Sequence, residues 1–350
     1  MPQSFHGPMT SFRAAVVQFE ATPDDTAANL RTVERLAREA VGDGARLVVF
    51  PELCLLGYWH LRRHTAARLH ELASPADGPL IGQVLALAQK LGAGIGAGFL
   101  EESGGTLFNS YAVCLPDGQV HVHRKLHAFE HEAIASGSTY TVFDTPWGFR
   151  AGVLICWDNN LVENVRITAL LGATVLIAPH QTGGTKSRSP YGMKPIPLPV
   201  WENRETDPAG VEEAFNGPNG RGWLMRWLPA RAHDNGLFVL FSNGVGRDDD
   251  EVRTGNAMIL DPYGRIVAET PVPAESVVTA DLDLDLVPLS TGRRWLRGRR
   301  PDLYAPLTHP TGTELDPRAA RFSPDPVQVE GLADQQDPLA PSRILWKVDQ

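Results

Sequence analysis

Residues 152–158, with the sequence GVLICWD, mark the point at which a predicted buried strand gives way to a helix. The residues from Phe149 to Ile155 are mostly apolar, and those after Asp158 place apolar side chains at helical spacing. Cys156 therefore lies at a strand-to-helix junction, where backbone N–H groups and the positive end of the helix dipole favour a thiolate and an oxyanion. The alternative interpretation is that Cys156 is a small buried core residue.

The N-terminal part of the chain predicts an α/β fold. A strand over residues 12–19, a helix and a second strand over residues 45–50 follow one another with short connections. This order is typical of a βαβ unit with neighbouring parallel strands. The second strand ends just before Glu52, and a later predicted strand, over residues 119–124, ends just before Lys125.

The three residues at the predicted strand ends have chemistries that fit one reaction. Because the carboxyl ends of parallel strands meet at one edge of a sheet, we expect Glu52, Lys125 and Cys156 to lie close together. A thiol nucleophile needs a base, and the oxyanion that its attack creates needs a positive donor. Taken alone, Glu52 could be a solvated residue at a helix start, and Lys125 a solvated surface residue.

The composition excludes several classes of partner. The chain has 350 residues, a formal net charge of −9 and an isoelectric point near 5.7, which argues against nucleic acid or an anionic membrane as the main partner. Three widely spaced cysteines give no disulfide framework and fit a reducing compartment. No stretch approaches the roughly 18 apolar residues of a membrane helix, and residues 1–11 lack the features of a secretory signal. We therefore expect a cytoplasmic protein.

A cluster of histidines in one segment raises the question of a metal site. His121, His123, His127 and His131 lie close together in the sequence. They lack companion cysteines or carboxylates at the spacing of a tetrahedral ligand set. We therefore expect no bound metal.

Three motifs resemble those of the nitrilase superfamily, the carbon–nitrogen hydrolases that use a Glu-Lys-Cys triad. They are VVFPEL at residues 48–53, HRKLH at residues 123–127 and GVLICWD at residues 152–158. The resemblance covers roughly residues 12–305, which we expect to form one carbon–nitrogen hydrolase domain. It implies a four-layer αββα sandwich whose subunits pair through their helical faces into a homodimer or higher oligomer. It also implies that no metal or organic cofactor is needed.

The resemblance implies a role for each residue of the triad. Cys156 attacks a carbonyl or nitrile carbon and forms a covalent intermediate, a thioester in the case of an amide. Glu52 takes the thiol proton, passes it to the departing nitrogen and later activates water. Lys125 and the backbone N–H of Trp157 hold the oxyanion.

Many members of this superfamily carry a second glutamate after the lysine, and two residues are candidates here. Counting seven residues forward from Lys125 favours Glu132, whereas counting back from Gly137 favours Glu130. We expect Glu132 to be the second catalytic glutamate.

Four further residues are expected to contact the substrate, namely Tyr58, Trp157, Asn159 and His180. The first three belong to the motifs or adjoin them, and His180 follows the next predicted strand. Asn159 and Asn160 occupy places where carbamoyl hydrolases of amino-acid ureides tend to carry arginines. Because amides offer hydrogen bonds without charge, a free α-carboxylate on the substrate is disfavoured.

The motifs point to two branches of the superfamily. Nitrile-cleaving members typically read Cys-Trp-Glu-Asn, which is close to CWDN at residues 156–159, whereas PELCLLGY at residues 51–58 looks more like amidases and carbamoyl hydrolases. We predict a thiol hydrolase of a small linear amide or ureide, with a nitrilase as the alternative. An acyltransferase, in which an amine replaces water, and a non-catalytic binding protein are further alternatives.

Two segments fall outside the regular pattern. Residues 185–222 are rich in proline, glycine and aromatic residues, and we expect a loop that forms a lid or pocket wall, with a disordered insertion as the alternative. Residues 306–350 are proline-rich and aperiodic, which predicts a C-terminal arm or tail.

Overall fold

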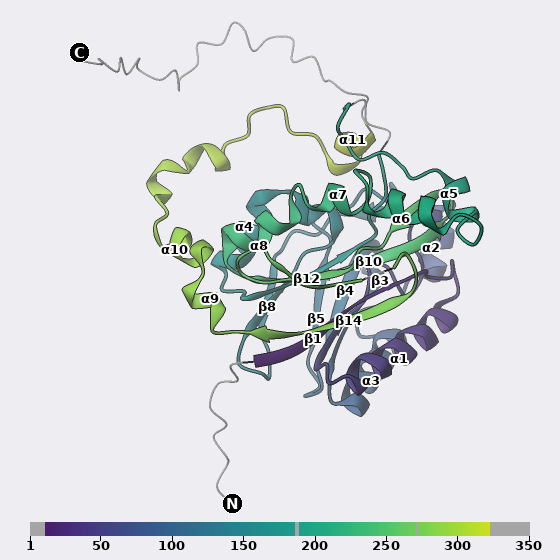
Figure 1. Cartoon of the computed structure of the whole chain (residues 1–350), viewed down its shortest axis with the longest axis horizontal. Coiled ribbons are helices and arrows are strands. Elements are labelled where there is room, and N and C mark those ends of the chain that lie inside the picture. The colour runs from purple at the N-terminus through teal and green to yellow at the C-terminus, as the bar shows by residue number, and fades with distance from the viewer. Residues whose placement is uncertain (1–10, 186–188, 271, 323–350) are drawn as a thin grey trace, which may run out of the picture.

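The computed structural model describes residues 11–185, 189–270 and 272–322, and it shows an α/β protein built on one long, folded sheet (Figure 1). The strands follow one another in space as β5–β4–β3–β2–β1–β10–β9–β8–β7. Their bounds are β1 (Ser11–Phe19), β2 (Leu47–Val49), β3 (Gly94–Ser103), β4 (Thr106–Cys114), β5 (Val120–Arg124), β7 (Thr141–Asp144), β8 (Arg150–Val153), β9 (Val175–His180) and β10 (Phe238–Asp248).

Shorter strands and one long strand extend this path at its sides. β14 (Ser276–Asp283) pairs antiparallel with β1 along most of its length. β11 (Glu251–Thr254) and β12 (Met258–Leu260) pair with β10, while β13 (Ile266–Glu269) pairs with β12 and β6 (Ile134–Ala135) with β4.

The sheet consists of two halves, β1 to β5 and β7 to β10, and it folds into two layers because only a short β1–β10 pairing connects them. β1 and β10 pair in parallel only at Gln18 with Asn243 and at Phe19 with Gly244. The largest apolar cluster contains residues of both halves, among them Val16 and Val49 from one and Val153 and Ile177 from the other. The two halves therefore lie face to face, with this cluster between them.

Helices cover the outer face of each layer. α1 (Thr26–Gly42) and α3 (Pro79–Leu91) pack on the half that contains β1 to β4. α4 (Val162–Leu170) and α8 (Leu228–Asn235) pack on the half that contains β8 to β10. Alternate residues of β1 serve the two faces, since Val16 enters the inner cluster and Val17 contacts the α1 side. The order helix, sheet, sheet, helix confirms the predicted four-layer αββα sandwich.

The remaining helices are short. They are α2 (Ala66–Leu72), α5 (Leu198–Glu202), α6 (Pro208–Asn216), α7 (Arg221–Leu224), α9 (Leu286–Leu289), α10 (Thr291–Arg297) and α11 (Pro317–Phe322), with the 3₁₀ turns η1 (Trp59–Arg63), η2 (Cys156–Asn160), η3 (Pro301–Leu303) and η4 (Ala305–Thr308). Among the described residues, no helix is long and apolar enough to cross a membrane.

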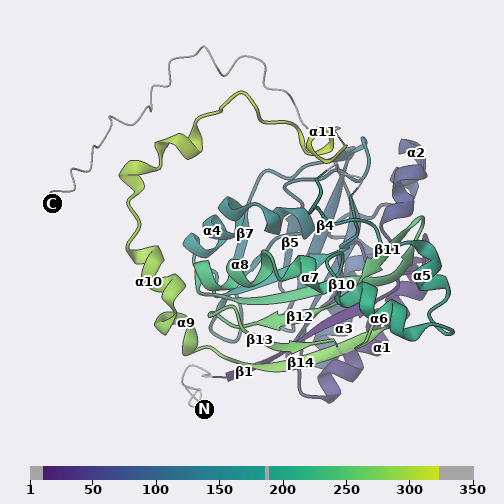
Figure 2. The same ribbon diagram turned by 45° about the horizontal axis from the view of Figure 1, so that its top comes forward.

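The two segments that the sequence left irregular are partly ordered into helices. Within residues 185–222 the chain forms α5 and α6, and their apolar sides, including Trp201 and Phe215, pack in a cluster of their own. Short helices with prolines in their first turns escape a periodicity search, because they span too few turns. After α10 the chain runs as an arm away from the body and returns to it at α11 (Figures 1 and 2). The rest of the predicted tail, residues 323–350, lies outside the described residues.

Candidate active site

The three predicted triad residues all follow strands whose carboxyl ends lie at one edge of the sandwich. Glu52 comes three residues after β2, Lys125 directly follows β5, and Cys156 opens η2 after β8. β2 runs parallel to β1, which in turn runs parallel to β10, β9 and β8. The topology thus brings together residues that are up to about a hundred positions apart in the chain.

Lys125 is the cation at the centre of a buried cluster of carboxylates. Its Nζ donates to Glu52 Oε1 at 2.7 Å and also to Glu130 Oε1, and all three side chains are essentially inaccessible. Asn109 Nδ2 donates to the same two oxygens, at 2.7 Å and 3.1 Å. Burial alone would lower the pKa of Lys125, but the carboxylates of Glu130 and Glu52 raise it above its ordinary value. Lys125 is therefore an ammonium group held between the two carboxylates.

The two carboxylate oxygens of Glu52 differ in their contacts. Its Oε1 accepts hydrogen bonds from Lys125 and Asn109, whereas Oε2 is buried and has no hydrogen-bond partner among the described residues. Burial raises the pKa of Glu52 well above its ordinary value, and electrostatic interaction with the nearby Cys156 raises it further, although Lys125 opposes both effects. A carboxylate with a raised pKa and a free oxygen is suited to accept the thiol proton.

Cys156 occupies a sharp turn between β8 and η2. Its φ of 48° lies in the left-handed region, which non-glycine residues seldom adopt and which is common at functional sites. The side chain is partly exposed, in contrast to Cys54 and Cys114, which are buried. Burial raises the pKa of Cys54 and of Cys114 to about 12. Of the three thiols, Cys156 is therefore the one placed to react.

Asp158 ties the cysteine turn to the loop that follows Lys125. Its carboxylate accepts hydrogen bonds from the backbone N–H groups of Ile155 at 3.2 Å, Leu126 at 3.1 Å and His127 at 2.9 Å. Burial would raise the pKa of Asp158, but the imidazoles of His123 at 3.7 Å and His127 at 2.9 Å lower it below its ordinary value. An ionised Asp158 thus fixes the position of the nucleophile relative to the lysine.

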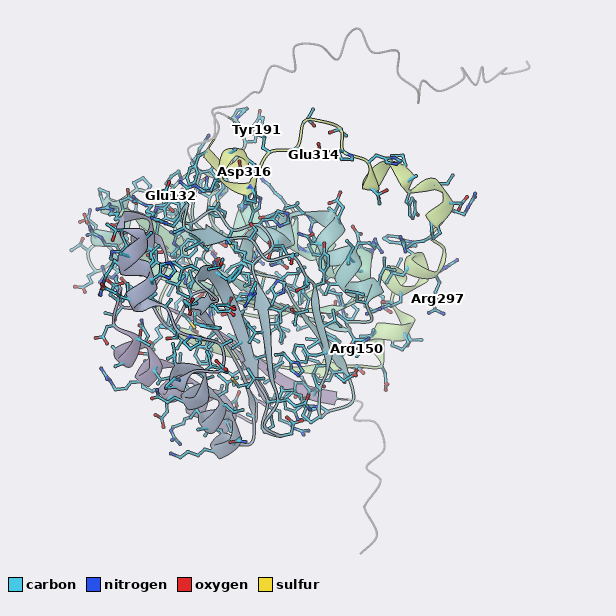
Figure 3. The ribbon with its side chains drawn as sticks, turned by 180° about the vertical axis from the view of Figure 1, so that it is seen from behind. Glu132, Arg150, Tyr191, Arg297, Glu314 and Asp316 are labelled. Carbon is cyan, nitrogen blue, oxygen red and sulfur yellow. The ribbon has the colours of Figure 1, made fainter. Side chains whose placement is uncertain are left out.

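The second glutamate of the cluster is Glu130, and the prediction of Glu132 is wrong. Glu130 is 1% exposed and contacts Lys125, whereas Glu132 is exposed and lies at the outer surface of the molecule (Figure 3). The loop closes early because Gly137 N donates to Lys125 O at 2.7 Å, and Phe129 N donates to Glu130 Oε2 at 3.0 Å. A count forward from the lysine assumed a longer loop, so only the count back from Gly137 reached the right residue.

Replacing Glu130 by glutamine is expected to lower kcat about 10²-fold, because the ammonium of Lys125 loses one of its two anionic partners and shifts away from the position that the oxyanion needs. The matched variant Glu132→Gln removes an exposed carboxylate and should leave kcat unchanged. Steady-state rates of both variants on one amide check this expectation. Equal rates for the two variants would contradict the placement of Glu130.

The four residues predicted to contact the substrate fall into two pairs. Tyr58 is buried, and its hydroxyl donates to Glu130 Oε1 at 3.3 Å; the partly exposed Trp157 directly follows the nucleophile. Asn159 and His180 lie behind the turn, since Asn159 Nδ2 donates to Leu154 O at 2.8 Å and to His180 Nε2 at 3.1 Å. The first pair borders the reacting groups, and the second supports the turn that carries them.

The stability of the protein should depend on the protonation of His180. Burial lowers its pKa to about 3, while its unfolded-state pKa is about 6.5. The neutral imidazole therefore contributes stability that is fully present above pH about 6.5 and is lost as the pH falls toward 3. Replacing His180 by glutamine, which keeps an acceptor for Asn159, should flatten the pH dependence of the free energy of unfolding by about 1.4 kcal/mol per pH unit in this window.

Urea unfolding at intervals between pH 6.5 and 3.5 measures this slope. The control is His309→Gln, which changes an exposed histidine and should leave the slope as it is in the unmodified protein. Parallel curves for the unmodified protein and His180→Gln would show that the imidazole is not held neutral.

The four histidines considered as metal ligands each have another partner. His121 stacks on Phe143, His123 Nδ1 lies 3.1 Å from Thr141 Oγ1, His127 Nδ1 lies 2.9 Å from Asp158, and His131 Nε2 lies 3.1 Å from His64 O.

A different set, Asp24, His60 and His64, places one ligand atom each within 4.8 Å of one another. The Nε2 atoms of His60 and His64 already lie 2.8 Å and 3.0 Å from the Asp24 carboxylate, and the Arg68 guanidinium lies 3.9 Å from it. Hydrogen bonds account for this cluster.

Sequence reasoning missed three residues that shape the site. Asn109 bridges the two glutamates, Asp158 ties the loops together, and Gln181 Nε2 donates to Glu52 O at 2.8 Å. Asn109 interrupts an apolar strand, which is a visible signal, because a buried amide needs partners. Gln181 and Asp158 carry no comparable signal, since Glu52, which Gln181 contacts, and Leu126 and His127, which Asp158 contacts, lie far away in the sequence.

Comparison with known proteins gives a consistent family. The model of the carbon–nitrogen hydrolase family matches residues 13–203 and 214–289. The chain is 32% identical over 306 residues to the (R)-stereoselective amidase of a Pseudomonas species, a match that covers 85% of this chain and 95% of that protein. It is 31% identical over 312 residues to N-carbamoylputrescine amidase of Solanum lycopersicum, covering 84% and 93% of the two chains.

A nitrilase and a solved amidase structure are also similar. The chain is 29% identical over 301 residues to an aliphatic nitrilase of Sinorhizobium fredii, with 80% of this chain and 89% of that protein covered. A mutant of the amidase from Nesterenkonia sp. AN1 in complex with butyramide has a TM-score of 0.62 at 21% identity and covers 84% of this chain and 95% of that one, which shows the shared fold. The chain belongs to the carbon–nitrogen hydrolase family and is a carbon–nitrogen bond hydrolase.

Proposed function

We propose that this hydrolase cleaves the carbon–nitrogen bond of a small linear amide or ureide through a thioester on Cys156. The observation that carries the proposal is the different hydrogen bonding of the two Glu52 oxygens. Oε1 accepts hydrogen bonds from Lys125 and Asn109, whereas the buried Oε2 has no partner among the described residues. This arrangement leaves one basic oxygen for the thiol proton and an ammonium group for the oxyanion.

In the first half of the proposed reaction, Cys156 Sγ attacks the carbonyl carbon while its proton passes to Glu52. The carbonyl oxygen becomes an oxyanion that Lys125 stabilises. When the tetrahedral intermediate collapses, the carbon–nitrogen bond breaks and Glu52 returns the proton to the nitrogen, so that ammonia or an amine leaves. Glu52 then takes a proton from water, the hydroxide attacks the thioester, and the acid and the free thiol form.

Two relatives support amides and ureides as substrates, since one is named an amidase and another acts on a carbamoyl compound by name. The alternative substrate is a nitrile, which the CWDN segment and the similarity to an aliphatic nitrilase favour. A nitrile consumes two waters and passes through a thioimidate, so the same triad would have to admit a second hydrolytic step.

A set of substrates with one alkyl chain separates these functions. Ammonia release from butyramide, butylurea and butyronitrile is measured with the unmodified protein and with Cys156→Ala. The proposal expects ammonia from the amide or the ureide, and none from the cysteine variant. Conversion of butyronitrile to butyric acid with the amide left untouched would make the nitrilase the correct function.

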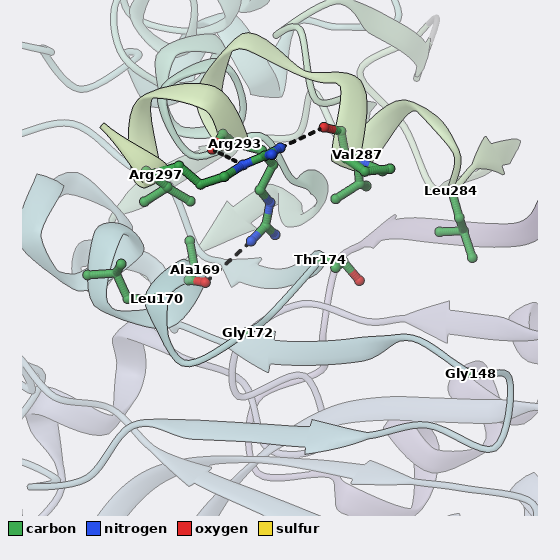
Figure 4. A pocket seen from close by; sticks show the side chains of 11 residues that line it. Gly148, Ala169, Leu170, Gly172, Thr174, Leu284, Val287, Arg293 and Arg297 are labelled. Carbon is green, nitrogen blue, oxygen red and sulfur yellow. Dashed lines mark hydrogen bonds between the residues drawn. The ribbon is translucent and has the colours of Figure 1, made fainter. Parts of the chain in front are cut away.

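We also propose that two copies of the chain associate through the helical face around α4, α9 and α10. A groove of about 580 Å³ lies on this face, and Arg293 crosses it to reach Ala169 O at 3.5 Å (Figure 4). Apolar side chains around the groove are exposed, among them Leu170, Leu289 and Trp295 at 43%, 73% and 48%. Exposed apolar surface of this kind is typical of an interface. Light scattering should give a dimer mass, and a monomer mass would contradict the proposal.

A further inference from the structure

The C-terminal helix α11 docks beside the candidate active site although it lies beyond the family match, which ends at residue 289. Figures 1 and 2 show the arm after α10 leaving the body and returning at α11. Nearly all of residues 301–316 are exposed along this excursion. The position of α11 therefore depends on its own contacts with the body.

Those contacts are made by three side chains of α11. The ring of Phe322 stacks on the ring of Trp59, with 6.5 Å between the ring centres. It is in T-shaped contact with the ring of Phe129, with 6.3 Å between the centres. Arg318 Nη1 donates to Phe129 O at 3.1 Å, and the Arg321 guanidinium lies 5.4 Å from the centre of the Phe129 ring. α11 is thus anchored mainly on Phe129.

Phe129 also belongs to the active site. Lys125 Nζ lies 4.5 Å from the centre of its ring, and the ring meets Trp157, the neighbour of the nucleophile, edge to face at 5.3 Å. One aromatic ring therefore separates α11 from the ammonium group that would hold the oxyanion. Residues of α11 lie within reach of a substrate that extends beyond Cys156.

The arginines of α11 carry positive charge that no carboxylate neutralises among the described residues. Arg318 donates to the backbone carbonyl of Phe129 and Arg321 to that of Gly184, and neither forms an ion pair with a residue that the structure describes. Asp316, the carboxylate nearest to Arg318 in the sequence, accepts hydrogen bonds from the backbone N–H groups at the start of α11. A guanidinium has five N–H donors, so both side chains keep donors for a further group.

We propose that α11 forms a wall of the substrate site and that Arg318 and Arg321 bind a carboxylate at the end of the substrate remote from the scissile bond. This inference rests on the proposed amide or ureide hydrolysis. Guanidinium groups bind carboxylates through charge-assisted hydrogen bonds, and the aromatic wall of Phe322 and Phe129 suits an alkyl chain between the two ends. Lys125 Nζ and the Arg321 guanidinium lie 4.5 Å and 5.4 Å from the centre of the same Phe129 ring, so the two groups are at most about 10 Å apart, the sum of these distances.

A carboxylate at the remote end also agrees with the residues next to the nucleophile. Asn159 is buried, and its amide nitrogen donates hydrogen bonds to Leu154 O and His180. Its side chain is also uncharged, so it does not supply a cation for a carboxylate beside the scissile bond. The carboxylates of Glu52 and Glu130 there would repel an anion. The two arginines contact Phe129 from α11 and offer positive charge for an anion there.

The test compares two six-carbon amides, hexanamide and the monoamide of adipic acid, which differ in the terminal carboxylate. The unmodified protein should show a higher kcat/KM for the monoamide of adipic acid, called the acid below, than for hexanamide. Arg318→Gln with Arg321→Gln should reduce the ratio of the two kcat/KM values, acid over hexanamide, at least about tenfold, because only the acid loses a charge-assisted hydrogen bond. Arg31→Gln, an exposed arginine on α1, is the control and should change neither value.

A second readout does not require turnover. An iodoacetamide with a hexyl tail and one with a hexanoate tail both alkylate Cys156 as Sγ displaces iodide, and the hexanoate reagent should react faster only while both arginines are present. The proposal would be overturned if the double variant and the unmodified protein preferred the hexanoate reagent to the same degree. It would also be overturned if the double variant lost kcat/KM equally on both amides. If neither amide is hydrolysed, amide hydrolysis is excluded for these substrates, and the alkylation rates still decide the role of α11.

Discussion

Replacing Cys156 by alanine is expected to reduce amide hydrolysis by about 10⁴-fold or more, because the residue is the nucleophile and no other group can form the thioester. The fold should persist, since alanine and cysteine carry similar strain at a φ of 48° and the site is partly open to solvent. Cys156→Gly should be more stable than Cys156→Ala, because glycine adopts positive φ without strain. Ammonia release and thermal unfolding measure both properties.

The matched control is Cys114→Ala, which removes a buried thiol in β4. It should lower the free energy of unfolding, as a small core cavity does, and keep most of the activity. The account would be contradicted if Cys156→Ala kept substantial activity, or if inactivation by a thiol reagent mapped to Cys54.

Replacing Lys125 by methionine is expected to remove activity and to lower the free energy of unfolding by about 3–5 kcal/mol, because it leaves the carboxylates of Glu52 and Glu130 buried without their cation. The deficit should depend on pH. Burial already holds the pKa of Glu52 above its ordinary value, and loss of the ammonium raises it further. A protonated Glu52 relieves the repulsion, so the deficit should shrink as the pH falls and grow as the pH rises through that pKa.

Urea unfolding at pH 5 and pH 8 checks the Lys125→Met prediction. Lys90→Met, which changes an exposed lysine at the end of α3, is the control and should show no deficit. Adding Glu130→Gln to Lys125→Met should recover part of the lost stability, since it removes one of the two unpaired charges. An unchanged stability for Lys125→Met would mean that the three charges are not coupled.

The α/β class and the proximity of the three triad residues could be predicted from the sequence because each depends on local pattern. Glu52, Lys125 and Cys156 each follow an apolar strand, and parallel strands end at one edge, so their proximity follows from topology. The αββα order came from the resemblance to the nitrilase superfamily. The fold explains the apolar runs, since the strands are buried on both faces.

What the sequence could not give depends on loop geometry and on distant partners. The choice between Glu130 and Glu132 turned on how the loop between Lys125 and Gly137 closes, and residue counting does not reveal that. The docking of α11 is a contact between Phe322 and residues 129 and 59, about 190 and 260 positions earlier in the chain. No periodicity within a six-residue helix signals such a contact.

The measurement that tests the central claim most directly is the intact mass of the protein quenched in acid during turnover of an amide. The account predicts a species heavier by the acyl group, with loss of ammonia, whose adduct maps to the peptide containing Cys156 and is absent in Cys156→Ala. Under the same conditions, Glu52→Gln should not form this species at an appreciable rate, because the thiol lacks its base. An adduct on another residue, or turnover that survives without Cys156, would contradict the account.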